Sequence, residues 1–232
     1  MANNFITFDG STGFITVPDD AALNFGVGDF SISLWVNDFG TTGAGSAIAK
    51  KINGITGWNI GLVGGTFTID VGDGGDTVSI GTSLTPNIWT HLVFTADRSG
   101  VLKYYKNFIT SGFTSMVGVG GNISNGEDLR ISNNLDGSLD DFRLHKSVLS
   151  AAHVEAIYNN GRGKKYTGAA GEGGGAAVAW NIDEGLGTDI IDEVAALTGA
   201  FTGGVSWQTG GAPFNKGSVI TGPEFMEELE KW

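Results

Sequence analysis

The sequence predicts an all-β fold in which two antiparallel sheets form a sandwich, with one short helix inside the chain and another at its C-terminus. Short runs that alternate apolar and polar residues recur along most of the chain, as half-buried strands do. Turn residues separate these runs. The 232 residues include 39 glycines, which suit tight turns, and only 4 prolines. Only two segments have helical start and stop signals, so helices are a minor part of the fold.

The alternating runs predict the strands in chain order. The chain opens with a hairpin of residues 5–8 and 14–17, and an acidic loop over residues 18–29 follows. The next expected strands cover residues 30–36, 48–51, 58–63, 66–71, 78–80, 89–96, 101–107 and 129–132. The pattern of residues 113–121 leaves strand and loop both open.

A strand and a helix close this series. Strict alternation over residues 139–144 puts Leu139, Asp141 and Arg143 on one face and Asp140, Phe142 and Leu144 on the other. This places an acid, Asp140, on the core side of the strand. A helix is expected over Ala151–Tyr158, with Ser150 as its N-cap and a left-handed C-cap in residues 159–161.

Four motifs occur in the order of a known family: FDGSTGFITVPDDAALNFGVGDFSISLWV, GWNIGLVGGTFTIDVGDGG, IWTHLVFTADRSGVLKYYKN and DGSLDDFRLHKSVLSAAHVEAIYNNG. Residues 5–160 therefore resemble the laminin G-like, concanavalin A-like jelly rolls. The resemblance implies a two-sheet jelly-roll sandwich. It does not imply one function, because this fold serves lectins, adhesion modules, glycan lyases and hydrolases.

The C-terminal part is expected to complete the same sandwich. A first unit over residues 1–166 is followed by a glycine-rich linker over 167–178. Residues 179–215 resemble the segment that precedes the FDG strand in many family members, which suggests a permuted order with strands near Trp180 and Trp207 at the sheet edges. The alternative is a truncated second repeat, but so short a segment could not fold alone.

The tail over residues 216–232 is predicted to form a short helix. Pro223 suits its first turn, and the acids that follow complement the helix dipole. Phe225, Leu229 and Trp232 fall on one face of this helix. They either pack on the chain's own sandwich or dock on a partner chain.

Composition narrows the function classes. The net charge of -12 argues against nucleic-acid binding through phosphate neutralisation and against docking on anionic membranes. No stretch is apolar enough for a membrane span, and the N-terminus lacks the pattern of a secretory signal. With no cysteine, the chain has no disulfide and no thiolate metal site.

Catalytic patterns are missing from the sequence. No strand has the E-x-D-x-[x]-E spacing of hydrolases with this fold, and Asp183 and Glu184 lie in a turn that acids can close. His91, His145 and His153 lack a G-x-S-x-G context. His91 lies in the middle of an expected strand, which favours a structural role, and we therefore expect a non-enzyme.

The family resemblance implies one structural calcium ion. Its ligands would be the Asp140 carboxylate and main-chain carbonyls near Asp9 and around Gly28, a set of hard oxygens that suits calcium. Alternatively, Asp140 accepts main-chain amides without a metal. A second group of acids, Asp70, Asp73 and Asp76, has suitable residue types but reads more simply as a solvated turn.

Glycan binding requires aromatic and planar polar side chains that a ligand can reach. The candidates are Trp35, Trp58, Asn59, Tyr104 and Tyr105. The competing explanation for each aromatic residue is packing in the core.

These observations favour a non-catalytic recognition or scaffold module. The expected setting is the surface of a bacteriophage particle, as a capsid decoration or fibre-associated protein, with other virion proteins, cell-surface glycans or copies of itself as partners. The alternative is a glycan-binding adhesion module of a secreted bacterial protein. A polysaccharide lyase or hydrolase is the third hypothesis.

Overall fold

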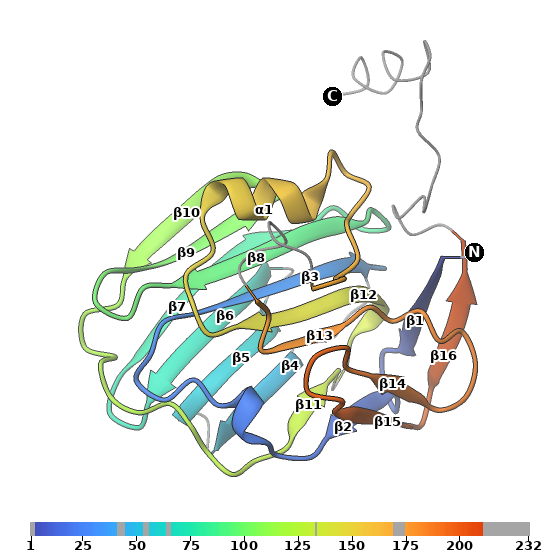
Figure 1. The fold of residues 1–232 in the computed structure, drawn as a ribbon, viewed down its shortest axis with the longest axis horizontal. Coiled ribbons are helices and arrows are strands. Elements are labelled where there is room, and N and C mark those ends of the chain that lie inside the picture. Colours follow the sequence, from blue (N-terminus) through green and yellow to red (C-terminus); the bar gives the residue numbers. More distant parts are fainter. Residues whose placement is uncertain are drawn as a thin grey trace.

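The protein is a two-layer β-sandwich with one α-helix (Figure 1). The structure, a computed structural model, describes residues 3–40, 45–52, 56–63, 66–132, 134–168 and 175–210. Sheet A has the strand order β10-β9-β8-β3-β12-β1-β16, with β13 also paired to β12. Sheet B has the order β14-β15-β2-β11-β4-β5-β6-β7. All described strand pairs are antiparallel, as the sequence predicts.

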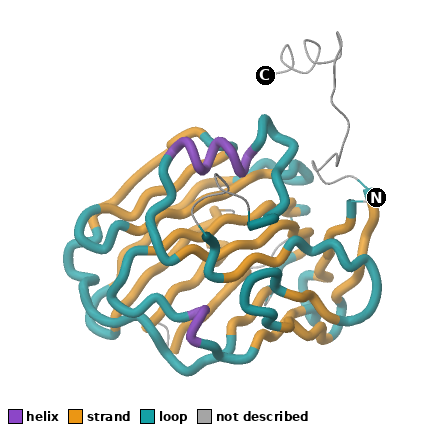
Figure 2. The backbone as a smooth tube through the Cα atoms, in the orientation of Figure 1, coloured by secondary structure: helices purple, strands orange, loops and turns teal. Residues whose placement is uncertain are grey.

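The elements follow the expected order, with additional strands in the second half. Their bounds are β1 Asn4–Asp9, β2 Phe14–Val17, the short 3-10 helix η1 Ala21–Leu23, β3 Phe30–Asp38, β4 Gly45–Ile52, β5 Thr56–Val63, β6 Thr66–Asp73, β7 Thr77–Ser83, β8 Thr90–Ala96, β9 Val101–Lys106, β10 Ile109–Ser115, β11 Leu129–Ile131, β12 Asp136–His145, α1 Ala151–Tyr158, β13 Val178–Trp180, β14 Asp189–Ile191, β15 Thr198–Thr202 and β16 Val205–Thr209. The ambiguous segment thus begins in a strand, β10. Figure 2 shows strands and the loops between them, with helix as a small part.

The main hydrophobic core lies between the two sheets. Ile6 and Ile32 enter it from sheet A, and Ile15, Ile60 and Ile69 enter it from sheet B. All five are fully buried. Burial of a side chain of this size stabilises the fold by about 1.5–3 kcal/mol relative to an exposed one, so the alternation of apolar residues determines which face of each strand points inward.

Helix α1 covers part of the outer face of sheet A, over β8 and β9 (Figure 1). Val154 and Ile157 of the helix form a second, smaller core with Val93 and Tyr105 of those strands. The predicted caps are confirmed: the Ser150 side chain accepts a bond from the His153 amide, and Asn159 adopts a left-handed conformation with φ of 50°. Sheet A is therefore buried on both sides where the helix lies.

A bulge in β12 reverses the predicted faces of the residues before it, Leu139 and Asp140, while Phe142 and Leu144 face the core as expected. Asp140 pairs with Trp35 and Arg143 pairs with Ser33, so β12 has one residue more than β3 over this interval. Asp141 takes up the extra length with φ of 45°. The core-facing residues are Leu139, Phe142 and Leu144. The prediction of Asp140 on the core side was wrong, because alternation does not continue through a bulge.

Residues 178–209 add strands to both sheets. Strand β16 pairs with β1, and Trp207 lies opposite Ile6. Strand β15 pairs with β2, and β13 pairs with β12, where Trp180 lies opposite Phe142. The Trp180 and Phe142 rings stack with centroids 5.5 Å apart and planes 8° apart, so this late segment contributes to the main core.

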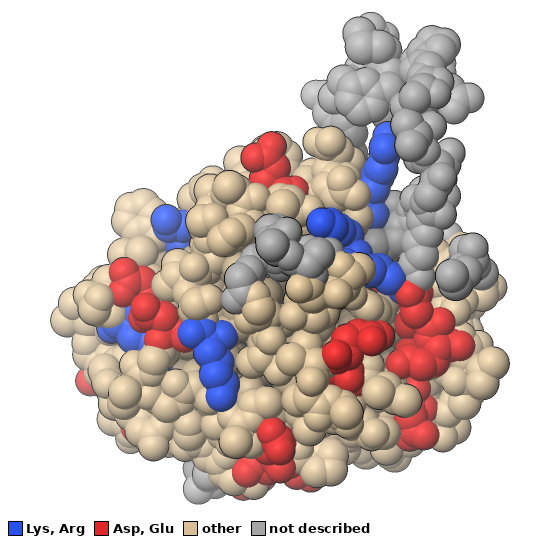
Figure 3. All heavy atoms as spheres, in the orientation of Figure 1, with Lys and Arg blue, Asp and Glu red and all other residues tan. Residues whose placement is uncertain are grey.

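Charged side chains are interspersed on the face that Figure 3 shows. Acidic groups lie in several places, with basic side chains between them. In the described residues, no helix is long and apolar enough to cross a membrane. The tail with Phe225, Leu229 and Trp232 lies outside the described residues.

Candidate ligand-binding face

The outer face of sheet B is accessible along its β6–β7 edge. In sheet A, every residue of β8 is buried, and β12 is buried at all positions except its first. In sheet B, β6 alternates buried and partly exposed residues over most of its length, and β7 alternates partly exposed and exposed residues at its start. A ligand could therefore reach the outward side chains of β6 and β7, whereas the neighbouring β5 is buried over residues 57–62.

One continuous cross-strand row runs over this outer face. The pairing registers place Thr16, Arg130, Ala49, Asn59, Asp70 and Ser79 side by side on six neighbouring strands. Directly paired residues point to the same face of a sheet. We call this row and Phe14 beside it the polar face of sheet B. The residues adjacent to the row along the strands, such as Ile15, Ile48, Ile60 and Ile69, point into the core.

Three polar side chains of the row form a connected group. Asn59 Nδ2 donates to Asp70 Oδ2 at 3.1 Å, and Ser79 Oγ donates to Asp70 Oδ1 at 2.6 Å. These bonds fix the orientation of the Asn59 amide, because its NH₂ group must face the carboxylate. Asn59 Oδ1 is then left buried and without a hydrogen-bond partner. An unsatisfied buried acceptor costs about 1–3 kcal/mol.

The other end of the row presents a cation on an aromatic ring. The Arg130 guanidinium carbon lies 3.6 Å from the centre of the Phe14 ring. Arg130 is exposed, and Phe14 is partly buried. Stacking on the ring holds the guanidinium flat while its N–H groups stay available at its edge.

The centre of the face is built from small residues. The pairing places Gly57, Gly61 and Gly72 on the same side as Asn59. Gly81 of β7 lies on this side too, and a Cβ there would approach the Phe67 carbonyl oxygen at 2.4 Å. Exposure decreases from Ser79 through Asp70 to Asn59, which is 4% exposed, and increases again through Ala49 to Arg130. The middle of the row is thus less accessible than its two flanks.

Acids along this row are too far apart for paired-carboxylate catalysis. Asp189 on β14 extends the row through Ala200 of β15. Asp70 lies six strand steps from Asp189, which corresponds to about 29 Å at 4.8 Å per step. Glycosidases use two carboxyl groups about 5–9.5 Å apart, so these two acids cannot work as such a pair.

His91 is part of the interior. It is fully buried, its Nε2 lies 3.0 Å from Ser33 Oγ, and its ring stacks on Trp35 at 5.0 Å. Burial, with the Arg143 charge as a second cause, lowers the pKa of His91 to about 3. The ring is therefore neutral at neutral pH, as a structural histidine would be.

The expected aromatic ligand contacts lie inside the protein. Trp58 is in the main core beside Phe25, and Trp35 lies on the outer side of sheet A, stacked on Tyr158 at 5.7 Å. Tyr104 is partly buried and packs against the main core, and Tyr105 packs under α1. Asn59 is the one nominated ligand contact that points to the outer face of sheet B.

The residues nominated for calcium do not come together. Asp9 pairs with Asp136 at one end of β12 and Gly28 precedes the opposite end of β3, a separation of about 30 Å along the nine-residue strand. Asp140 is fully buried between these ends, where its Oδ1 accepts a bond from the Asp141 amide. This set does not fit one coordination shell, and calcium binding as such stays a prediction.

Other acids close turns. Asp9 accepts bonds from the Thr12 hydroxyl and from three amides of its own turn, which hold its pKa well below the ordinary range. Asp73 accepts from the amides of Asp76, Gly121 and Gly75, which lower its pKa in the same way. Glu184 Oε1 accepts from the Ile191 amide at 2.8 Å, and Asp183 pairs with Lys165. Among the described residues, no three acidic or histidine side chains form a metal-binding group.

Sequence reasoning missed Asp70, Ser79, Arg130 and Phe14 as one surface. Asp70 stood out only as part of a supposed turn with Asp73 and Asp76. Alternation does predict that each of these residues lies on the outer face of its strand. The registers that bring them side by side depend on pairing between distant strands.

The fold defines a β-sandwich protein of the jelly-roll type. Residues 9–155, more than half of the chain, match the concanavalin A-like lectin/glucanases superfamily. The chain belongs to this superfamily. No curated protein sequence matches it.

Three solved structures share this fold at low sequence identity. A candidate carbohydrate binding protein from Bacteroides ovatus superposes with a TM-score of 0.68 at 18% identity, over 92% of this chain and 61% of that one. The binding domain of Paraclostridial Mosquitocidal Protein 1 gives 0.55 at 23% identity, over 63% and 40%. A botulinum neurotoxin type C structure, reported for cell entry that depends on interaction with two ganglioside molecules, gives 0.55 at 17% identity, over 67% and 42%. The chain thus spans less than two thirds of each of these proteins.

Proposed function

We propose that this chain is a non-catalytic glycan-binding module and that the polar face of sheet B is its binding surface. The observation that carries the proposal is the Asp70 carboxylate, which Asn59 and Ser79 hold in place at a partly exposed position of this face. Sugar hydroxyls can donate to such acceptors and accept from a guanidinium, so one saccharide can use both ends of the row.

The dimensions of the row suit a sugar ring. Arg130 and Asn59 are two strand steps apart, about 9.6 Å, and the small Ala49 side chain lies between them. A ring lying over Ala49 would place one hydroxyl edge toward Asn59 and Asp70 and the other toward Arg130. The fold relatives support the proposal, since one is a candidate carbohydrate binding protein and another is reported with gangliosides, which are glycolipids.

A glycan array tests the proposal, with each condition run in calcium and in a chelator. Asp70→Asn keeps the shape of the side chain and removes its charge. Losing a hydrogen bond to a charged group costs about 1.5–3 kcal/mol, so binding should weaken roughly 10–100-fold. Asp189→Asn is the matched control, because it removes the same charge from the far end of the row and should leave affinity unchanged.

Two results would overturn the proposal. One is a wild-type protein that binds no glycan in either condition. The other is equal loss of affinity in the Asp70→Asn and Asp189→Asn variants, which would locate binding elsewhere. A dependence on calcium would show that the ion takes part, whichever residues bind it.

The biological setting also stays a prediction. A role on the surface of a bacteriophage particle is compatible with a β-sandwich recognition module, and so is a secreted bacterial adhesion module. Capsid and tail genes next to the coding sequence, together with co-purification with particles, would support the first setting. Genes for secreted surface proteins in that position would support the second.

A further inference from the structure

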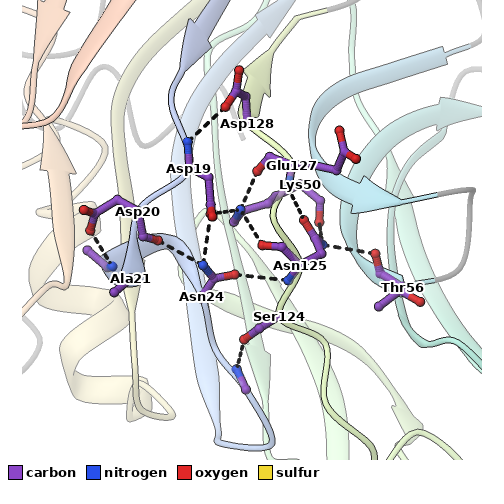
Figure 4. Close-up of polar contacts among 12 residues, drawn as sticks. Asp19, Asp20, Ala21, Asn24, Lys50, Thr56, Ser124, Asn125, Glu127 and Asp128 are labelled. Atoms are coloured by element: carbon purple, nitrogen blue, oxygen red, sulfur yellow. Dashed lines mark hydrogen bonds and ion pairs between the residues drawn. The ribbon is translucent and has the colours of Figure 1, made fainter.

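A buried ammonium group lies where two loops meet at one end of the sandwich (Figure 4). Lys50 belongs to β4, is 1% exposed, and pairs with Trp58, a core residue. Its stem therefore runs inward between the sheets. Its Nζ lies between the loop before β3 and the loop before β11.

Three oxygens surround this nitrogen. Nζ donates to Asp19 Oδ1 at 2.6 Å, to the Glu127 carbonyl oxygen at 2.5 Å and to the Asn125 carbonyl oxygen at 3.3 Å. An ammonium group has three N–H donors, so every donor of Lys50 has a partner. We call these three oxygens the Lys50 cage.

The walls of the cage are also held by bonds that do not involve the ammonium. Asn125 Nδ2 donates to the main-chain oxygens of Lys50 and Thr56, each at 3.2 Å. The Asp19 amide donates to Asp128 Oδ1 at 3.0 Å, and Asn24 Nδ2 donates to Asp19 Oδ1 at 3.0 Å (Figure 4). The oxygens are thus positioned by the surrounding loops, and the cage can persist when its occupant changes.

One carboxylate and two main-chain carbonyls are the hard oxygen ligands that alkali and alkaline-earth cations take in proteins. We propose that the Lys50 cage is a cation site whose resident cation is the chain's own ammonium group. Lys50 joins the two loops as a bound ion would, without depending on ion concentration. The lowered pKa of Asp19, caused first by the bond from Lys50, agrees with a cation held against this carboxylate.

Lys50→Val tests this inference, because valine suits a strand, keeps the apolar stem only as far as Cγ, and removes the nitrogen with the two carbons before it. The position that Nζ occupied is then open to an inorganic cation. Wild type and variant are compared by thermal unfolding in calcium chloride, in potassium chloride and in choline chloride of equal ionic strength, because choline is too large for the site.

In choline chloride the variant should unfold roughly 5–10 °C below wild type, since the oxygens of the cage lose their partner. At ten times its dissociation constant, calcium or potassium should raise the Tm of the variant by about 3–6 °C. The Tm of wild type should be the same in all three salts. Adding Asp19→Asn to the variant should abolish the response to cations.

Lys146→Val is the matched control. Lys146 is exposed and donates to one carbonyl oxygen, that of Ala21, at 2.8 Å, so its loss should create no response to cations. The inference is overturned if neither cation raises the Tm of Lys50→Val, or if the Tm of wild type rises as much as that of the variant. Should the variant not fold in choline chloride, its refolding yield with and without calcium provides the same comparison.

Discussion

Acid should destabilise this protein through His91 well before most carboxylates titrate. The ring is fully buried, stacks on Trp35 and Tyr158, and has Arg143 close enough to oppose a second positive charge. These surroundings lower the pKa of His91 from 6.5 to about 3 in the folded protein. An unfolded chain would instead protonate this histidine near its ordinary pKa of about 6.5.

The size of the effect follows from linkage. Below pH 6.5 the unfolded state binds a proton that the folded state does not, so the stability contribution is complete above pH 6.5 and is lost as pH falls toward 3. Each pH unit in this window costs about 1.4 kcal/mol. At pH 4.5 the loss is roughly 2–3 kcal/mol, which for a protein of this size lowers the Tm by about 5–10 °C.

The assay is thermal unfolding of wild type and His91→Gln between pH 7.5 and 4.5. Glutamine keeps a neutral planar group that can bond to Ser33, and it does not titrate. The slope of stability with pH should be lower in the variant by about 1.4 kcal/mol per unit. His153→Gln on the partly exposed side of α1 is the control and should follow the wild-type curve. Equal slopes in wild type and His91→Gln would refute the reasoning from burial.

Two further changes probe the packing of the sandwich. Arg143→Met should cost about 3–5 kcal/mol in urea unfolding, because Arg143 bonds to both oxygens of Asp141 at 2.6 and 2.7 Å and both side chains are fully buried. Adding Asp141→Asn should recover part of this loss, and strict additivity of the two losses would argue against a coupled pair. Trp180→Ala should cost about 3–5 kcal/mol, since this ring is fully buried against Phe142, whereas Trp207→Ala should cost much less because Trp207 is only partly buried. Similar stabilities of the two tryptophan variants would show that residues 178–209 add little to the core.

The elements with local signals were predictable from the sequence. Ser150 and Asn159 bound α1 because a side-chain acceptor and a left-handed residue act within one turn of the helix. Strand positions followed from alternation, and β3, β6 and β8 agree with the expected ranges within a few residues. The acids of the turn at Asp183 and Glu184 were expected to close a turn, and Glu184 does so through the Ile191 amide.

Residues whose position depends on a distant strand were not predictable in the same way. The bulge at Asp141 moved Asp140 to the outer face, and nothing in the local alternation signals an inserted residue. Trp35 and Trp58 were expected as ligand contacts, yet one packs under α1 and the other in the main core. An aromatic residue looks the same in sequence whether a helix covers its face or solvent does.

The sequence by itself determined the two-layer β architecture, because alternation and turns act over a few residues and need no partner to be recognised. Only the tertiary structure decided that Asn59, Asp70 and Ser79 form one group and that Lys50 ends in a cage of oxygens. These contacts depend on the register between strands and on the meeting of loops that are distant in sequence. Register is set by the packing of the whole core, so the chemistry of both sites appears only when the two sheets are assembled.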